Sequence, residues 1–190
     1  MVRFAVICAS NMNRSMEAHY QLQKNGYNIR SFGTGSAVRL PGRTADKPNV
    51  YKFGTPYKRI LDDLLSQNFP QYTKIGLIDM LRRNKTVKEA PQRFHEEYND
   101  FDIIFCCEER VFDAVCEELL QRAGMRSKPV HVINIEIEDN HREALEGGKT
   151  VLELARLIVE SKDLEQDMDG IIETVQKQVP HKLLYMLAYY

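Results

Sequence analysis

Cys8 and Arg14 frame a short segment whose residue types could carry out covalent chemistry. The segment reads Cys8-Ala9-Ser10-Asn11-Met12-Asn13-Arg14-Ser15. A cysteine thiolate is a strong nucleophile, and a neighbouring arginine offers a planar fork of N–H donors that grips two phosphoryl oxygens. Together they point to the hydrolysis of a phosphate monoester. The spacing alone is a weak signal, because both residue types are common, so the surrounding sequence must support it.

Each part of this segment has a task in such a reaction. Cys8 is the expected nucleophile, since the positive end of a following helix favours its thiolate form. Phosphate binding is expected from the loop's backbone N–H groups and neighbouring side chains, at Ala9, Ser10, Asn11, Met12, Asn13, Arg14 and Ser15. Ser15 is expected to donate a hydrogen bond to the Cys8 sulfur, although a serine there is also a good helix cap. Asn11 or Asn13 is expected to hold the loop's shape.

The reaction also needs a proton donor for the leaving oxygen, at the end of another strand that reaches the same edge. Asp139 follows the apolar run 130–137 and fits this place. It could protonate the leaving serine oxygen and then activate the water that hydrolyses the phosphocysteine. Position alone leaves Glu136, Glu138 and Asp102 as equal alternatives.

Strand-like and helix-like segments alternate along the chain. Strands are predicted at 2–8, 28–32, 101–107 and 130–137, with a late strand in the final LLYMLAYY. Helices are predicted at 15–25, 57–67, 73–84, 108–123, 149–161 and 164–178. This alternation predicts an α/β fold, a three-layer sandwich with a central, mostly parallel sheet. The Cys8 segment would then lie at the carboxyl ends of the strands, where such sheets bind ligands.

Length and composition set further limits. The length of 190 residues predicts a single domain, 1–190. A cap insertion is expected at about 40–90. It would contain most of the irregular stretch 36–56 and the helices at 57–84. The net charge of −1 gives no global field toward nucleic acid, and no apolar run approaches the roughly 20 residues of a membrane span. No Cys-x-x-Cys pair occurs, so no metal or cofactor is expected. These features predict a protein of the cytosol or nucleus.

Several segments together resemble one known family. They are CASNMNRSMEAH, RSFGTG, RLPG, DKPNVY, CEERV and PVHVINIEIEDNH, in this order. From about residue 2 to its last residue the chain resembles the RNA polymerase II C-terminal-domain phosphatases of the eukaryotic cleavage-and-polyadenylation complex. The resemblance implies a fold related to the low-molecular-weight tyrosine phosphatases, with a small helical cap. It implies that Cys8 is the nucleophile, Arg14 the phosphate clamp and Asp139 the general acid.

The same resemblance implies a substrate, a partner and a location. The substrate is phosphoserine before a cis proline, chiefly the fifth-position serine of the heptad repeat, and the partner is a symplekin-like scaffold. The location is the nucleus, with the cytoplasm as a second compartment, and no direct contact with nucleic acid or membrane is expected. The implied substrate groove comprises Arg39, Leu40, Pro41, Gly42 and part of the cap around Tyr72–Met80, including Met80. A narrow groove could select the tight bend of a cis prolyl bond.

The chain departs from the family pattern at Arg39, where the family usually has Lys, at Ile75 in place of Asn, and at Arg82 in place of Asp. Segment 144–153 also diverges. These departures fit a diverged paralogue and bear on substrate affinity and partner binding. Two rival hypotheses are a low-molecular-weight tyrosine phosphatase, which would carry Asp-Pro at the acid and a second cysteine in the loop, and a non-catalytic scaffold-binding subunit.

Four other features have simpler interpretations. His19 is expected to pack or hydrogen-bond rather than act as a base, and Cys106 and Cys107 are expected to pack in the core. The cluster Arg82-Arg83-Asn84-Lys85 is expected to be a solvated helix end. Gly33 and Gly35 are expected to form a tight turn after the second strand.

Overall fold

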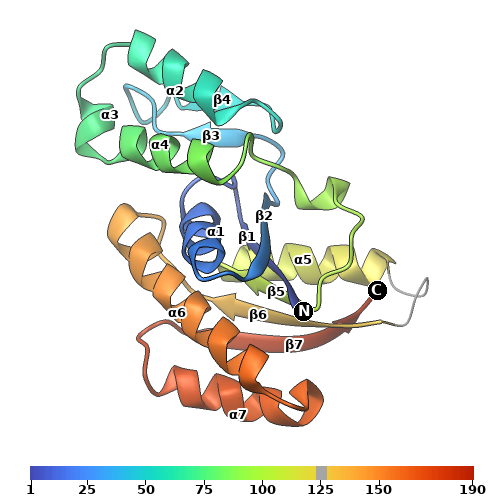
Figure 1. The fold of residues 1–190 in the computed structure, drawn as a ribbon. Helices are drawn as coiled ribbons and strands as arrows, with labels where there is room; N and C mark the ends of the chain where they lie inside the picture. Colours follow the sequence, from blue (N-terminus) through green and yellow to red (C-terminus); the bar gives the residue numbers. More distant parts are fainter. Residues whose placement is uncertain (123–127) are drawn as a thin grey trace.

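A computed structural model describes residues 1–122 and 128–190 (Figure 1). The strands are β1 (Arg3–Cys8), β2 (Asn28–Gly33), β3 (Val38–Leu40), β4 (Asn49–Tyr51), β5 (Ile103–Cys106), β6 (Pro129–Ile135) and β7 (Leu183–Tyr189). The helices are α1 (Arg14–Lys24), α2 (Tyr57–Ser66), α3 (Gln71–Lys74), α4 (Leu77–Val87), α5 (Glu109–Arg122), α6 (His141–Glu160) and α7 (Leu164–Gln176), with a 3-10 turn, η1, at Phe94–Glu96.

The central sheet has the strand order β2-β1-β5-β6-β7. The first four of these strands pair in parallel, and β7 pairs antiparallel to β6 at one edge. The α/β class and the mostly parallel sheet are therefore confirmed, and the predicted late strand is β7. Parallel strands end at a common edge, so the residues that follow β1, β5 and β6 are brought together.

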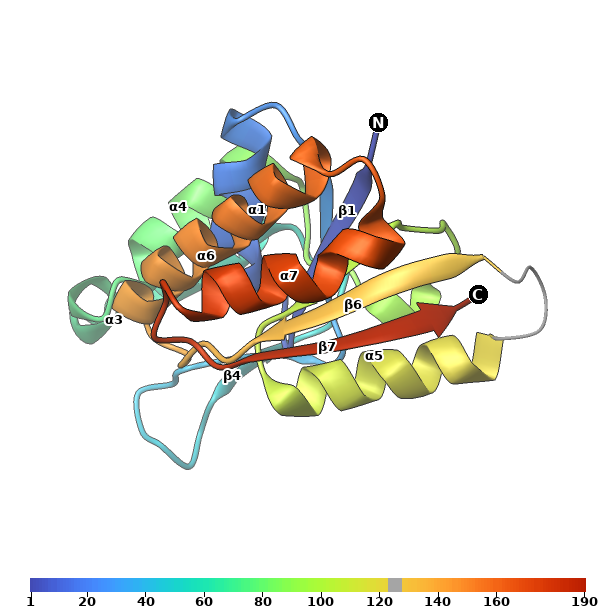
Figure 2. The same ribbon diagram turned by 90° about the horizontal axis from the view of Figure 1, so that it is seen from below.

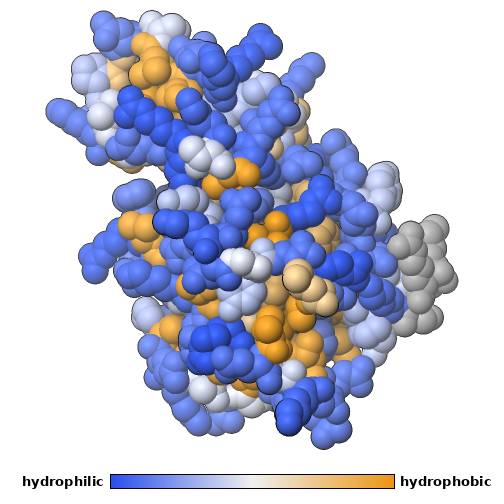
Figure 3. Space-filling view, viewed as in Figure 1, coloured by the Kyte–Doolittle hydropathy of each residue, from blue (hydrophilic) through white to orange (hydrophobic). Residues whose placement is uncertain are grey.

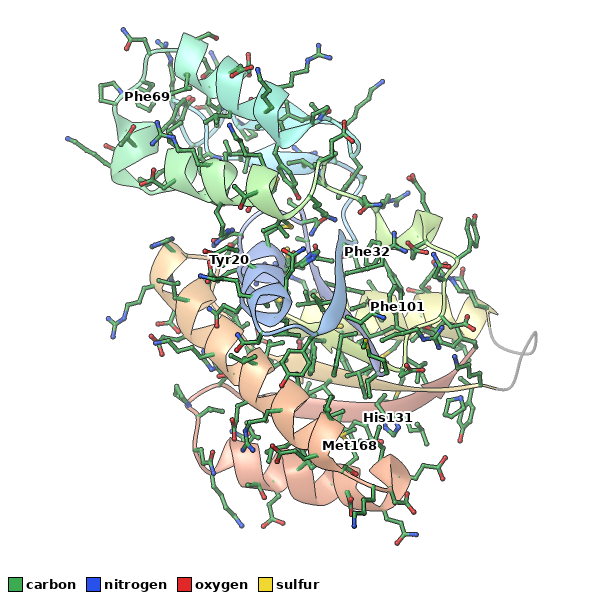
Figure 4. The ribbon with its side chains drawn as sticks, viewed as in Figure 1. Tyr20, Phe32, Phe69, Phe101, His131 and Met168 are labelled. Carbon is green, nitrogen blue, oxygen red and sulfur yellow. The ribbon has the colours of Figure 1, made fainter. Side chains whose placement is uncertain are left out.

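Helices cover both faces of the sheet and make the three-layer sandwich. Helices α1, α6 and α7 lie on one face and α5 on the other, as the view from below shows (Figure 2). Alternate residues of β1 serve the two cores: Val6 packs toward α1 and α6, and Ile7 packs toward α5. Figure 4 places Met168 on the α7 side and Phe101 on the α5 side. The strand that carries Cys8 is thus fixed from both faces.

The cap is the hairpin β3–β4 together with α2, α3 and α4, inserted between β2 and η1 (Figure 1). Its core is a separate apolar cluster that includes Tyr57 and Leu81. Phe69, labelled in the cap in Figure 4, packs against this cluster, and its ring lies edge-on to that of Tyr72 with 5.0 Å between centroids. Met12 and Met16, from the segment after β1, belong to this same cluster. The cap therefore packs directly on the loop that follows Cys8.

Three predicted elements differ from the structure. The stretch 36–56, predicted to be irregular, contains the short hairpin β3–β4. The single helix predicted at 73–84 is two helices, because Gly76 adopts a positive φ of 77° and ends the first. Helix α6 begins at His141 rather than near 149, because the Asn140 side chain caps it by accepting the Glu143 N–H at 2.9 Å. Residue 123 of the helix predicted at 108–123 lies outside the described residues.

The buried side chain of His19 makes the stability of the fold depend on pH. Its ring is buried on α1 and shares a 2.8 Å hydrogen bond with the Ser31 hydroxyl, as the packing interpretation predicted. Burial, with smaller contributions from Lys88 and Arg30, lowers the pKa of His19 from 6.5 to about 4. Between these pH values the unfolded chain binds a proton that the folded chain does not. This group is therefore expected to reduce the free energy of unfolding by up to about 3 kcal/mol as pH falls from 6.5 to 4.

Urea unfolding at several pH values measures this effect, with His19→Gln as the comparison. The variant is expected to be less stable at pH 7 but to have a shallower slope of stability against pH. Equal slopes for the two proteins would show that His19 does not titrate as its burial requires.

Candidate active site

The loop between β1 and α1 is a cup of backbone N–H groups around the Cys8 sulfur. Cys8 ends β1 and Arg14 begins α1, so residues 9–13 alone form the turn, and Asn11 adopts a left-handed conformation with φ of 54°. The N–H groups of residues 9–14 donate to no acceptor within the described part of the chain. Unpaired N–H groups at a helix start form an anion site.

Ser15 faces the nucleophile directly. Its hydroxyl lies 3.0 Å from Cys8 Sγ, and Asn11 Nδ2 donates to the same hydroxyl oxygen at 3.1 Å. Because Asn11 occupies the hydroxyl as an acceptor, the hydroxyl proton is free to point at the sulfur. The helix-cap alternative is wrong for Ser15, since the N-cap of α1 is Asn13 and it makes no side-chain cap.

Hydrogen bonds from Nη1 fix the guanidinium of Arg14 in place, and its Nε edge remains available to a ligand. Nη1 donates to the carbonyl oxygens of Cys107 at 3.3 Å and Ile137 at 2.9 Å, and to Glu108 Oε2 at 3.2 Å. The buried Nε has no hydrogen-bond partner among the described residues. Burial alone would lower the pKa of Arg14, but negative charge at Cys8 and Asp139 contributes to raising it above its usual value. The side chain is therefore a cation in a fixed position, and some of its N–H donors remain available to bind phosphate.

Asp139 is the carboxylate, of the four considered from the sequence, that reaches the pocket over Cys8. It follows β6, its Oδ1 accepts from Asn13 Nδ2 at 2.9 Å, and it lies 3.6 Å from Arg14 Nε. Its side chain is 61% exposed, which leaves it open to a substrate or water.

The other three carboxylates are engaged elsewhere. Glu136 accepts the Glu109 N–H at 3.0 Å, and Glu138 lies 3.5 Å from Asn140 Nδ2. Asp102 pairs with Arg3 at the start of β1, which is the opposite edge of the sheet. None of the three lines the pocket over Cys8. Asp139 is therefore the candidate general acid that reaches the pocket.

A pocket of about 270 Å³ lies over Cys8, between the cap and the start of α6. Figure 3 shows the surface hollowed between these two parts on the side where α6 begins. The pocket is lined by the catalytic candidates, by the hairpin β3–β4 and by the junction of α3 with α4: Cys8, Ser10, Met12, Asn13, Arg14, Arg39, Leu40, Pro41, Ile75, Gly76, Leu77, Met80, Asp139, Asn140 and His141.

Most residues of the predicted groove lie on this lining, but two do not. Arg39, Leu40, Pro41 and Met80 line the pocket. Gly42 lies in the β3–β4 turn, so close to the Lys47 carbonyl that a Cβ would overlap it at 1.7 Å. Tyr72 is buried in the cap, where its hydroxyl hydrogen-bonds Asn49 and Gln67. Asn140 and His141 are lining residues that the sequence analysis did not identify.

The prediction of a solvated helix end at 82–85 is wrong for its two central residues. Asn84 is fully buried and Arg83 is mostly buried, and both donate to backbone carbonyls of the loop after Cys8. Arg82 and Lys85 are exposed, as predicted. The signal was present in the helical spacing: Asn84 lies seven, four and three residues after Leu77, Met80 and Leu81, all buried.

The remaining expectations concern packing around the loop. Cys106 and Cys107 are fully buried, which confirms their packing role. Gly33 closes β2 beside the loop, where a Cβ would lie 2.7 Å from the Ala9 carbonyl oxygen. The Gly35 N–H donates to that same oxygen at 2.9 Å. These glycines therefore let the second strand approach the loop closely.

Comparisons with known proteins agree with this geometry. The profile of the Ssu72-like protein family matches residues 2–190. A Candida glabrata protein, the RNA polymerase II C-terminal domain phosphatase SSU72, is 52% identical over 172 residues, which are 90% of this chain and 84% of that protein. The Caenorhabditis elegans protein of the same description, ssup-72, is 48% identical over 191 residues, 100% of this chain and 97% of the relative.

A solved structure is similar over the whole chain. It is Drosophila melanogaster Ssu72 with Symplekin, bound to a cis peptidomimetic of the C-terminal domain that is phosphorylated on the fifth-position serine. The TM-score is 0.94 at 41% identity, covering 100% of this chain and 98% of that one. With a family match from residue 2 to residue 190 and relatives 52% and 48% identical over 84% and 97% of their own length, the chain belongs to the Ssu72 family.

Proposed function

We propose that this chain is a cysteine-dependent phosphatase of the RNA polymerase II C-terminal domain, which removes phosphate chiefly from the fifth-position serine of the heptad. The observation that carries the proposal is the convergence of Cys8, Arg14 and Asp139 on one pocket in a chain of the Ssu72 family. The relatives are named as phosphatases of this domain. The three side chains supply the nucleophile, the charge and the proton that phosphate-ester hydrolysis requires.

In the first step the phosphate of the substrate enters the cup of N–H groups. Its non-bridging oxygens accept from these groups and from the free edge of Arg14. The Cys8 thiolate attacks phosphorus from the floor of the pocket while the bond from phosphorus to the serine oxygen breaks. Asp139 gives its proton to that oxygen, so the products are a phosphocysteine, a free serine hydroxyl and an Asp139 carboxylate.

In the second step water replaces the departed serine. Asp139, now a carboxylate, takes a proton from the water while the water oxygen attacks phosphorus. The bond from phosphorus to sulfur breaks, and the Ser15 hydroxyl, 3.0 Å from the sulfur, stabilises the leaving thiolate. Inorganic phosphate is released, and both the thiolate and the protonated carboxyl are restored.

The shape of the pocket supports selection of a bent peptide. The cap lines the pocket with Leu40 and Pro41 of the hairpin and with Ile75 and Met80, and the start of α6 lines it with Asn140 and His141. A cis prolyl bond folds the chain back within two residues, whereas a trans bond extends it into a wall. Proline after the phosphoserine in the cis form is therefore the proposed substrate.

The proposed setting follows from the relatives. The partners are the phosphorylated C-terminal domain and a symplekin-like scaffold, since the Drosophila protein was solved with both Symplekin and a phosphorylated peptide of that domain. The location is the nucleus, and the role lies in transcription and mRNA 3′-end processing. No helix within residues 1–122 and 128–190 is long and apolar enough to cross a membrane.

Phosphate release from heptad peptides tests the proposal. Peptides with phosphoserine at position five and the following proline locked cis or trans by an alkene isostere are compared with a phosphotyrosine peptide of equal length. Turnover of the cis-locked phosphoserine peptide alone is the expected result. Preference for the phosphotyrosine peptide would show that the chain is a tyrosine phosphatase instead. An inert protein that still binds a symplekin-like scaffold would replace it by a non-catalytic subunit.

A further inference from the structure

Three consecutive carbonyl groups of the loop after Cys8 are held by side chains of the cap. The Tyr57 hydroxyl of α2 donates to the Asn11 carbonyl at 2.7 Å. Asn84 Nδ2 of α4 donates to the Met12 carbonyl at 2.7 Å. Arg83 Nη2 donates to the carbonyls of Met12 and Asn13 at 3.2 and 3.3 Å.

These donors are themselves fixed in place. Tyr57 and Asn84 are fully buried. Arg83 forms an ion pair with the buried Glu17 of α1, and its Nη2 also donates to Asn84 Oδ1 at 2.9 Å. A buried set in which each polar group has partners is rigid, because any movement leaves a donor or acceptor unpaired.

The geometry of the peptide group gives these contacts a consequence for anion binding. In a trans peptide the carbonyl of one residue and the N–H of the next point in opposite directions. Carbonyls of residues 11 and 12 drawn toward the cap therefore aim the N–H groups of Met12 and Asn13 away from it. The Asn13 carbonyl also accepts the Glu17 N–H at 2.9 Å, so α1 and Arg83 together orient the N–H of Arg14. These N–H groups have no protein acceptor in the described part of the chain, and Met12, Asn13 and Arg14 all line the pocket over Cys8.

We infer that Tyr57, Arg83 and Asn84 are positioning residues for the phosphatase reaction, which fix the anion-binding loop through its carbonyl groups. The inference rests on the proposed function and gives the cap a second task besides its wall of the substrate pocket. Movement of a reacting group by about 1 Å can cost about a hundredfold in rate. Loss of one of these buried contacts is therefore expected to slow the reaction even for substrates too small to touch the cap.

The test uses two variants that remove polar atoms but keep the branching of the side chain, Tyr57→Phe and Asn84→Leu, with Lys85→Gln as a matched control. Lys85 lies on the same helix, is exposed and does not line the pocket. The substrate is p-nitrophenyl phosphate, and binding of inorganic phosphate is followed by the amide NMR shifts of residues 12–14. For Asn84→Leu we expect kcat to fall about 10- to 100-fold and phosphate affinity to fall about tenfold, and for Tyr57→Phe smaller losses in the same direction. Lys85→Gln is expected to equal wild type in both measurements.

Two further readouts separate positioning from general stability and from the proposed function. Melting temperatures identify any loss that comes from unfolding, and the phosphate-induced shifts of residues 12–14 are compared only among folded variants. Wild-type kcat and phosphate affinity, within twofold, in both Tyr57→Phe and Asn84→Leu would overturn the inference while the phosphatase function stands. A wild-type protein that binds phosphate at these amides, loses this binding in the variants and hydrolyses no substrate would overturn the function alone.

Discussion

Cys8→Ser is expected to lose phosphatase turnover by at least about 10⁴-fold, the size of effect seen when a catalytic nucleophile is removed. A serine hydroxyl is not ionised near neutral pH, and it would need a base. The side chain that hydrogen-bonds the sulfur is Ser15, and its hydroxyl is not a base. The measurement is phosphate release from the fifth-position phosphoserine peptide.

The matched control is Cys116→Ser, a half-buried cysteine on α5 that does not line the pocket. This control is expected to keep wild-type turnover. Cys8→Ser should still bind inorganic phosphate, because the loop N–H groups and Arg14 remain in place. More than about one per cent of wild-type turnover in Cys8→Ser would rule out a phosphocysteine intermediate.

Asp139→Asn is expected to lose about 10²- to 10⁴-fold in turnover of phosphoserine peptides, the usual range for a general acid. The loss should be much smaller on p-nitrophenyl phosphate, because nitrophenolate leaves without a proton. The amide keeps the size of the carboxyl, and its oxygen can still accept from Asn13. The comparison of the two substrates therefore isolates proton transfer from the shape of the pocket.

Glu138→Gln serves as the control for Asp139→Asn. Glu138 is the adjacent residue, has the same carboxyl group and lies outside the pocket lining. The turnover of the Glu138→Gln variant is expected to match that of wild type on both substrates. An equal loss for Asp139→Asn on the peptide and on the aryl phosphate would assign Asp139 a role in phosphate binding instead of proton donation.

The segment from Cys8 to Ser15 could be predicted from the sequence because its structure is local. A buried strand, a short polar loop and a helix follow one another in the chain, and the edge where they meet is fixed by the α/β architecture. Position in the sequence did not distinguish Asp139 from Glu136, Glu138 and Asp102 as the proton donor. What separates it from Glu136 and Glu138 is the direction of each side chain after β6, which depends on tertiary contacts such as those to Asn13 and Glu109.

The burial of Arg83 and Asn84 was missed because the charged composition of residues 82–85 outweighed the helical spacing that places Asn84 on the buried face of α4. A run of two arginines, an asparagine and a lysine is usually solvated, and only the packing of α4 on the loop after Cys8 buries its centre. The early start of α6 was hidden by Gly147 and Gly148, which lower helix propensity. Gly147 is tolerated because it packs against Ile137, where a Cβ would lie 2.3 Å from Ile137 Cδ1.

The anchoring of Arg14 also determines when the site can be completed during synthesis. Its three hydrogen-bond acceptors belong to residues 93, 94 and 123 positions later in the chain, at Cys107, Glu108 and Ile137. The central strand β1 likewise gains its second neighbour only when β5 has been made. Contacts this distant in sequence form late on a growing chain. Cys8 and Arg14 are therefore synthesised long before the acceptors that fix Arg14, and the last of these, Ile137, is added only two residues before Asp139.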